Sequence, residues 1–240
     1  MGDNEIHGAY FLDYASGKKK IAYAGSFGKS DKIDADSPIC SWLKDYDYIT
    51  VRESSAKSLI NNLGIDNVSQ VLDPTLLLNK EQWGEFINKD IKGDYVLLYQ
   101  LHSNADMDRY AKEFAKKMNI RLIRITPLLH RVFKGGRAVY LPDISTFLSY
   151  IKNAKYMITD SFHGTAFAIN FNTPFVDILP GETKTRNQSI LELTGLTGQI
   201  LNDYNDFSFI NKVPDFTNAN KIIDEERRAS YEILKKMIND

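Results

Sequence analysis

Short β-rich runs alternate along this chain with longer segments whose apolar residues recur every three or four positions. Continuous apolar runs suit strands that are buried on both faces, whereas the longer spacing suits amphipathic helices. Regular alternation of the two patterns favours an α/β fold built on parallel strands. With 240 residues, the chain has room for one large domain or two small ones.

The predicted elements divide into two series separated by the polar stretch Asn88–Gly93. We therefore predict a first domain over residues 1–90 and a second, doubly wound domain over residues 91–240. Strands are predicted at Ile21–Ala24, Tyr48–Val51, Val68–Leu72, Tyr95–Leu98, Leu122–Ile125, Tyr156–Thr159 and Phe175–Leu179. Helices are predicted from Ser37-Pro38, over Ala56–Leu63, Glu81–Ile87, Met107–Met118 and Ile144–Ile151, from Gly164, and over Asn218–Asn239.

The first domain contains fewer predicted strands than a sheet of this class usually has, which is about five or six. It is therefore expected to be either a small lid or the remainder of a larger domain whose early part is missing.

The amino-acid composition excludes several classes of function. The 30 basic and 31 acidic residues nearly cancel, which disfavours strong nucleic-acid binding without a local patch. The single cysteine, Cys40, has apolar neighbours and is expected to pack in a helix rather than act as a nucleophile. No apolar run approaches the ~20 residues of a membrane span, and the amino terminus lacks a signal-peptide pattern. The default location is cytoplasmic, with peripheral attachment to the inner membrane face left open.

The segment Tyr156–Asp177 is the most informative for chemistry. Its buried strand is followed at once by Asp160, Ser161 and His163, at the sheet edge where open α/β folds bind their ligands. A helix of small residues then opens with Gly164 and Thr165, whose N–H groups are predicted to attract a phosphate or carboxylate. The alternative is structural: Asp160 is then only a helix cap and His163 only bonds a backbone carbonyl.

Further candidates follow neighbouring strands. Lys184 and Arg186 are predicted on a loop, Gly181–Asn187, where a guanidinium can pair with a carboxylate or phosphate. His102, after the strand Tyr95–Leu98, is a weaker candidate at the same edge, and His7 and His130 have no such placement. Histidine and cysteine spacing matches no metal motif, so we predict a metal-independent protein without a bound cofactor.

Several ordered motifs resemble the polysaccharide pyruvyl transferase family. These are YFLDY (10–14), KKKIAYAGSFG (18–28), SWLKDYDYITVRE (41–53), VLDPTLLL (71–78), DSFHG (160–164) with its small-residue helix and N-x-P-F, and an arginine nine residues before Gly195-Leu196. The resemblance implies a GT-B-like pair of Rossmann-type units facing a cleft. It further implies transfer of a pyruvyl group from phosphoenolpyruvate to sugar hydroxyls as a cyclic ketal. The implied partners are phosphoenolpyruvate and a glycan or lipid-linked sugar acceptor, with the oligomeric state unknown.

By this resemblance, His163 matches the family histidine associated with the donor, and Arg186 matches a basic residue after the following strand. Our hypothesis is that Ser161, Arg186 and the N–H groups of Gly164 and Thr165 hold the donor's anionic groups. His163 then binds the phosphate or supplies a proton, with Lys184 as a further cation. Asp160 either orients His163 or acts as a base, although the helix-cap role is favoured for it.

Two departures from the family pattern carry consequences. Where some members have S-R-x-H-G, Ser161 replaces the arginine, so that charge must come from elsewhere. The family's glycine-bearing first loop and G-S-D-Q-x-W-N motif do not occur, so the chain is expected to start after them. Two other functions stay open: a GT-B glycosyltransferase using a sugar nucleotide, and a truncated, non-catalytic binding module.

Overall fold

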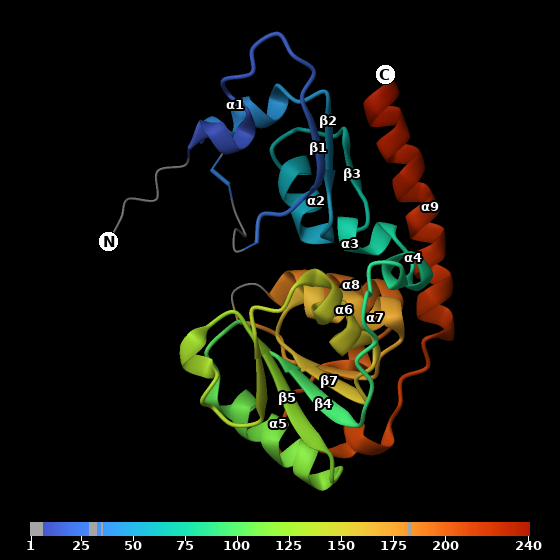
Figure 1. Ribbon diagram of the computed structural model, residues 1–240. Helices are drawn as coiled ribbons and strands as arrows, with labels where there is room; N and C mark the ends of the chain where they lie inside the picture. Colours follow the sequence, from blue (N-terminus) through green and yellow to red (C-terminus); the bar gives the residue numbers. More distant parts are fainter. Residues whose placement is uncertain (1–6, 29–32, 35, 182–183) are drawn as a thin grey trace. The chain divides into compact units, whose positions relative to one another are not determined.

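The computed structural model describes residues 7–28, 33–34, 36–181 and 184–240 as an α/β protein with two compact units (Figure 1). Unit 1 combines residues 1–74 with residues 226–240, and unit 2 is residues 75–225. Each unit has its own parallel sheet, which confirms the predicted α/β class. No helix in the described part of the chain is both long and apolar enough to cross a membrane.

Unit 1 contains a three-stranded sheet in the order β1-β2-β3. Its elements are η1 (Gly8–Phe11), β1 (Ile21–Gly25), α1 (Pro38–Lys44), β2 (Tyr48–Val51), α2 (Ser54–Asn61) and β3 (Val68–Gln70). Helix α1 begins as predicted, because the Ser37 side chain accepts a hydrogen bond from the Ile39 N–H and Pro38 occupies the first turn. Cys40 is buried in this helix, as expected of a packing thiol.

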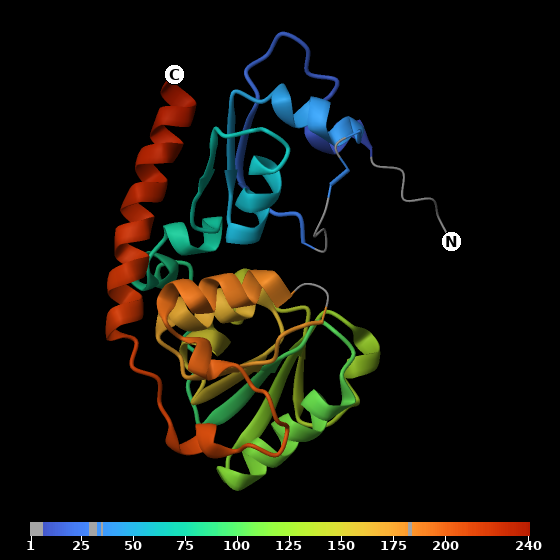
Figure 2. The same ribbon diagram turned by 180° about the vertical axis from the view of Figure 1, so that it is seen from behind.

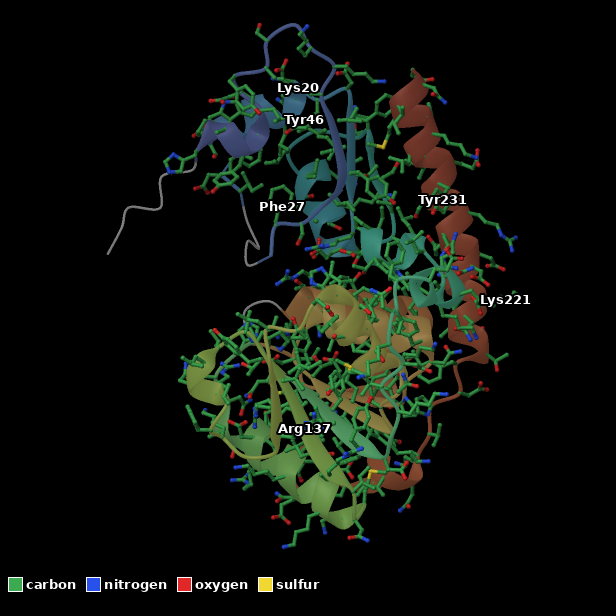
Figure 3. All side chains as sticks on the ribbon, viewed as in Figure 1. Lys20, Phe27, Tyr46, Arg137, Lys221 and Tyr231 are labelled. Atoms are coloured by element: carbon green, nitrogen blue, oxygen red, sulfur yellow. The ribbon has the colours of Figure 1, made fainter. Side chains whose placement is uncertain are left out.

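The carboxy-terminal helix α9 (Thr217–Asn239) contributes its second half to unit 1. The Leu72 N–H donates to the Ser230 hydroxyl at 2.9 Å, and the Tyr48 hydroxyl donates to Asp240 at 2.6 Å. Figure 3 labels Tyr231 on this helix, and Lys20 close to Tyr46 at the other side of the same unit. Residues 226–240 therefore belong to the same unit as β1, β2 and β3.

Unit 2 contains five parallel strands in the order β6-β5-β4-β7-β8. Helix α5 lies on one face of this sheet, and α6, α7 and α8 lie on the other (Figures 1 and 2). The elements are α4 (Lys80–Gly84), β4 (Tyr95–Tyr99), α5 (Ala105–Lys117), β5 (Arg121–Thr126), η2 (Leu129–Arg131), β6 (Arg137–Tyr140), α6 (Ile144–Lys152), β7 (Tyr156–Thr159), α7 (Phe162–Phe171), β8 (Phe175–Asp177), α8 (Lys184–Thr194), η3 (Thr197–Gln199) and η4 (Ser208–Asn211), with α3 (Pro74–Leu77) at the junction with unit 1.

Both faces of β4 are buried, which explains its continuous apolar run. Val96 and Leu98 belong to the core on the α5 face, with Met107 and Phe114. Tyr95, which alternates with them and faces the other side of the sheet, packs edge-to-face on Tyr150 of α6. A strand enclosed on both sides in this way is typical of doubly wound sheets.

The structure corrects three expectations about the chain's organisation. The division falls at Pro74/Thr75 rather than at Asn88–Gly93. The reason is that α4 packs within unit 2: Trp83 contacts the Phe167 ring, and its indole N–H donates to the Thr75 carbonyl at 2.8 Å. Strand β6 was not predicted, and the segment from Lys184 that was predicted as a loop is the first turn of α8.

Candidate functional site

The sheet of unit 2 has a topological switch point between β4 and β7. Chain connections run from β4 through β5 to β6 on one side and from β7 to β8 on the other. Tyr99 and Thr159, the last residues of β4 and β7, are register partners, so the loops that follow them leave the sheet side by side. Open α/β sheets bind ligands at this place, beyond the carboxyl ends of the strands.

Asp160 joins the two loops at the switch point. Its carboxylate is 3% exposed and accepts hydrogen bonds from the Leu101 N–H at 2.6 Å and the His102 N–H at 2.9 Å. The same Oδ2 atom lies 3.1 Å from Nδ1 of His102, whose side chain is 53% exposed. Asp160 therefore fixes the backbone and the imidazole of His102. It does not cap α7, which corrects the role favoured for it above.

Arg131, in η2, holds the same loop from the other side. Its side chain is 2% exposed and donates to the carbonyls of Gln100 at 2.6 Å and Leu101 at 3.1 Å, and to the Ser103 hydroxyl at 3.2 Å. The two peptide groups between Gln100 and His102 are thus bound at their carbonyls by Arg131 and at their N–H groups by Asp160. We call this arrangement the 100–102 clamp. Its buried cation and buried anion both interact with the peptide dipoles between them.

Helix α7 begins directly after Asp160, and Ser161 is its cap. The Ser161 hydroxyl accepts from the Gly164 N–H at 3.3 Å, and its carbonyl accepts from the Thr165 N–H at 2.9 Å. Ser161 is 1% exposed and also hydrogen-bonds with the Tyr99 side chain. Both N–H groups are thus used inside the helix and Ser161 is buried, so the predicted anion-binding roles of these three residues are not supported.

Gly164 has a packing role instead. A Cβ atom at this position would lie 2.5 Å from Thr159 Oγ1, 2.9 Å from Met157 Cε and 3.1 Å from Tyr99 Cδ1. The small residues at the start of α7 therefore allow strands β4 and β7 to approach the helix backbone. The structure therefore supports close packing on the strands as the reason for a glycine at position 164.

His163 is exposed on the first turn of α7, with its ring edge-to-face to Phe162 at 5.4 Å. The imidazole is thus at the carboxyl edge of the sheet and on the surface rather than sealed beneath the strands. The sequence hypothesis requires an exposed imidazole at this edge, and His163 is exposed.

A buried polar network connects the first turns of α7 and α8. Thr165, fully buried, donates to the carboxylate of Asp177 at the end of β8. The Asn187 side-chain amide donates to Asp177 Oδ2 at 2.9 Å and to the Thr165 hydroxyl at 3.3 Å. Burial raises the pKa of Asp177 to about 6, although its two hydrogen-bond donors act in the opposite direction. Thr165 therefore joins the two helices rather than facing a ligand.

Asp177 is expected to make stability pH-dependent. Because its folded pKa of about 6 exceeds the ordinary value of 3.8, the folded state holds the proton more tightly. The free energy of unfolding should therefore fall as the pH rises through this range, by about 2 kcal/mol between roughly pH 4.5 and 7.5. Urea unfolding at both pH values should show this difference between wild type and Asp177→Asn. If the free energies of unfolding of the two proteins changed equally with pH, the raised pKa of Asp177 would be contradicted.

Lys184 and Arg186 lie in the first turn of α8, Lys184 exposed and Arg186 half-buried. Two cations at a helix amino end, where the helix dipole is positive, are unfavourable unless an anion is near. Asn187 ties this turn to Thr165 and thus to the start of α7, two residues from His163. The structure thereby brings the segments that follow β4, β7 and β8 to one sheet edge. His102 lies on the first of these segments, His163 at the start of α7, and Lys184 and Arg186 at the start of α8.

Two arginines of this region were not predicted. Arg131 forms part of the 100–102 clamp, but nothing in its sequence context separates it from an exposed loop cation. Arg124 is 1% exposed in β5, donates to the Gln100 side chain at 3.1 Å and lies 2.6 Å from Asp108. The sequence did offer a signal for Arg124, because it is a charged residue within an otherwise apolar predicted strand. His130, which was given no placement, lies in η2 after β5 and is exposed.

The described residues contain no group of three histidine, cysteine, aspartate or glutamate side chains that could hold a metal ion. His102 and Asp160 are in contact at this edge, with Nδ1 of His102 3.1 Å from Oδ2 of Asp160. The chemistry that these residues can provide is proton transfer by imidazole and electrostatic binding of an anion.

Two solved structures resemble the chain at low identity. The Methanocaldococcus jannaschii UDP-GlcNAc 2-epimerase, in complex with UDP-GlcNAc and UDP, is 18% identical with a TM-score of 0.43, over 86% of this chain and 68% of its own. A Listeria monocytogenes protein described as a UDP-N-acetylglucosamine 2-epimerase is 14% identical with a TM-score of 0.43, over 79% of this chain and 57% of its own. Likeness at this level says nothing about activity.

No curated protein matches the chain significantly. The family model for polysaccharide pyruvyl transferases matches residues 2–179. This range contains most of the motifs that carried the resemblance, including DSFHG at the start of α7. The chain belongs to the polysaccharide pyruvyl transferase family.

Proposed function

We propose that the chain transfers the pyruvyl group of phosphoenolpyruvate to two hydroxyls of one sugar, forming a cyclic ketal and releasing phosphate. The observation that carries this proposal is the grouping of His163, Arg186 and Lys184 at the starts of α7 and α8, beside the switch point. Phosphoenolpyruvate has two anionic groups, and a site for it requires cations together with an acid that can reach its methylene carbon.

The proposed roles follow from placement. Arg186 and Lys184 bind the phosphate and carboxylate, taking the charge that the arginine of the family's basic motif supplies elsewhere. His163 binds the phosphate or donates a proton to the methylene carbon, which becomes a methyl group. The adjacent carbon is then electrophilic, a sugar hydroxyl adds to it, phosphate leaves, and a second hydroxyl closes the ketal. We place the reaction in the cytoplasm, with a free or lipid-linked glycan as acceptor.

Phosphate release from phosphoenolpyruvate should depend on an added glycan. Across a panel of oligosaccharides and lipid-linked sugars, we expect release with only a subset, and a mass increase of the matching acceptor by one pyruvyl ketal. The control is the same mixture with the glycan left out. Release that is independent of every acceptor would contradict transfer.

A thermal-shift comparison separates this proposal from its rivals. Phosphoenolpyruvate at saturating concentration should raise the melting temperature, because a ligand that binds only the folded state stabilises it. Stabilisation by sugar nucleotides alone would favour a glycosyltransferase. Binding of phosphoenolpyruvate without turnover would favour a non-catalytic binding module. Transfer that is restored by adding the amino-terminal segment of a family member would argue against such a module.

A further inference from the structure

We infer that His102 is a second catalytic residue of this site, the base that takes the proton of the attacking sugar hydroxyl, and that Asp160 and Arg131 are its positioning residues. The inference rests on the proposed function. It depends on a different imidazole from His163, on a different loop, and it assigns the proton transfer that the acceptor requires.

The contact with Asp160 determines which nitrogen of His102 is basic. Both carboxylate oxygens accept backbone N–H groups, of Leu101 at 2.6 Å and of His102 at 2.9 Å, so this carboxylate acts as an acceptor. A carboxylate oxygen 3.1 Å from Nδ1 then requires that Nδ1 carries the ring proton. In the neutral ring, Nε2 is left with a free lone pair. Because the side chain is 53% exposed while its partner is 3% exposed, the ring is held from the protein side and open to a ligand.

The 100–102 clamp explains why this histidine is held rigidly although it lies on a loop. Arg131 binds the carbonyls of Gln100 and Leu101, and Asp160 binds the N–H groups that follow each of them. Neither peptide group can rotate without losing a hydrogen bond to a buried charged side chain.

The proton balance of the proposed reaction calls for such a base. Two hydroxyl protons are lost when the ketal forms. One is equivalent to the proton gained by the methylene carbon, and the other leaves with phosphate as hydrogen phosphate. His163 supplies the first proton transfer, to carbon, and Nε2 of His102 accepts the proton from the attacking hydroxyl. Two imidazoles at adjacent loops let one act as acid while the other acts as base.

The test compares His102→Ala, His102→Gln and Asp160→Asn with wild type and with His130→Ala, an exposed histidine on the loop after β5. Phosphate release and ketal formation are measured with the full chain from pH 5 to 9, with and without added imidazole. Melting temperatures are recorded for each protein. Ring ¹⁵N chemical shifts report the His102 tautomer independently of activity.

We expect both His102 variants to lose about 10²- to 10⁴-fold in kcat, with KM for phosphoenolpyruvate nearly unchanged. His102→Ala should lose the acid limb of the pH profile and regain activity with imidazole. Asp160→Asn should lower kcat and move the proton from Nδ1 to Nε2, whereas His130→Ala should behave as wild type.

Two results would overturn the inference. One is His102→Ala with wild-type kcat and pH profile in a protein whose wild type is active. The other is a wild-type His102 protonated at Nε2. A wild-type chain that releases no phosphate with any acceptor contradicts the proposed function instead, and the tautomer measurement still tests the geometry of His102.

Discussion

Replacing His163 with alanine should lower kcat for pyruvyl transfer by about 10²- to 10⁴-fold, the range that positioned acid–base groups contribute. The melting temperature should remain within about 1 °C of wild type, because an exposed side chain on the first helical turn adds little packing and alanine is a good helix former. The measurement is acceptor-dependent phosphate release alongside thermal unfolding. A variant that transfers pyruvyl at the wild-type rate would remove His163 from the mechanism, and an equal loss of stability would assign it a structural role.

The His163→Ala and His102→Ala variants are expected to differ in how well they bind phosphoenolpyruvate. His163 is proposed to contact the donor, so His163→Ala should also weaken the thermal shift that phosphoenolpyruvate produces. His102→Ala should leave that shift unchanged. Equal loss of donor binding in both variants would contradict the separate roles.

Gly164→Val is the variant with the largest expected effect on stability. The new Cβ would meet Thr159 Oγ1 at 2.5 Å. That hydroxyl cannot move aside freely, because it donates to the Tyr99 carbonyl at 2.8 Å and accepts from the Ser161 N–H at 3.0 Å. Separating α7 from the sheet should cost about 3 kcal/mol or more in the free energy of unfolding.

Urea unfolding of Gly164→Val, Gly164→Ala and Gly198→Ala provides the measurement and its matched control. Gly198 lies in η3, where the described residues leave open space around a Cβ, so its alanine variant should change stability by less than about 1 kcal/mol. Gly164→Ala should fall between the other two. Equal stability of Gly164→Val and Gly198→Ala would show that α7 and the strands can move apart without cost.

Most of the sheet of unit 2 could be predicted because β4 and β7, at its centre, are continuous runs of mostly apolar residues. In β4 and β7 both faces are buried, so the pattern needs no knowledge of partners. Strand β6 escaped prediction because it lies at the sheet edge, pairs only with β5, and begins and ends with exposed residues, Arg137 and Tyr140. Figure 3 labels Arg137 at this edge.

Helix α8 and the boundary between the units depend on contacts that are distant in sequence. The buried side of α8 includes the polar Asn187, whose partner Asp177 is at the end of a strand. The polar stretch Asn88–Gly93 looked like a linker, yet the chain divides at Pro74 because Trp83 packs on Phe167. Neither of these contacts can be predicted from the residues next to it in the sequence.

The candidate site was predictable at the level of which loops form it. Strand ends in a doubly wound sheet converge, so His102, His163 and Arg186 could be placed at one edge from their positions after strands. Which side chains of these loops bind one another could not be predicted. Asp160 is adjacent to the start of α7 and looks like its cap, but its partner is His102 on another loop. Only the register of β4 and β7 brings that loop to it.

The two units differ in when they can be completed during synthesis. Unit 2 is a single continuous stretch, residues 75–225, so all of its strands are synthesised before residues 226–240. Unit 1 needs residues 226–240, which include the buried Met237 and the Ser230 hydroxyl that accepts the Leu72 N–H. The sheet of β1, β2 and β3 therefore lacks part of its packing until residues 226–240 have been synthesised. Proteolytic removal of residues 226–240 would accordingly weaken this sheet before the sheet of unit 2.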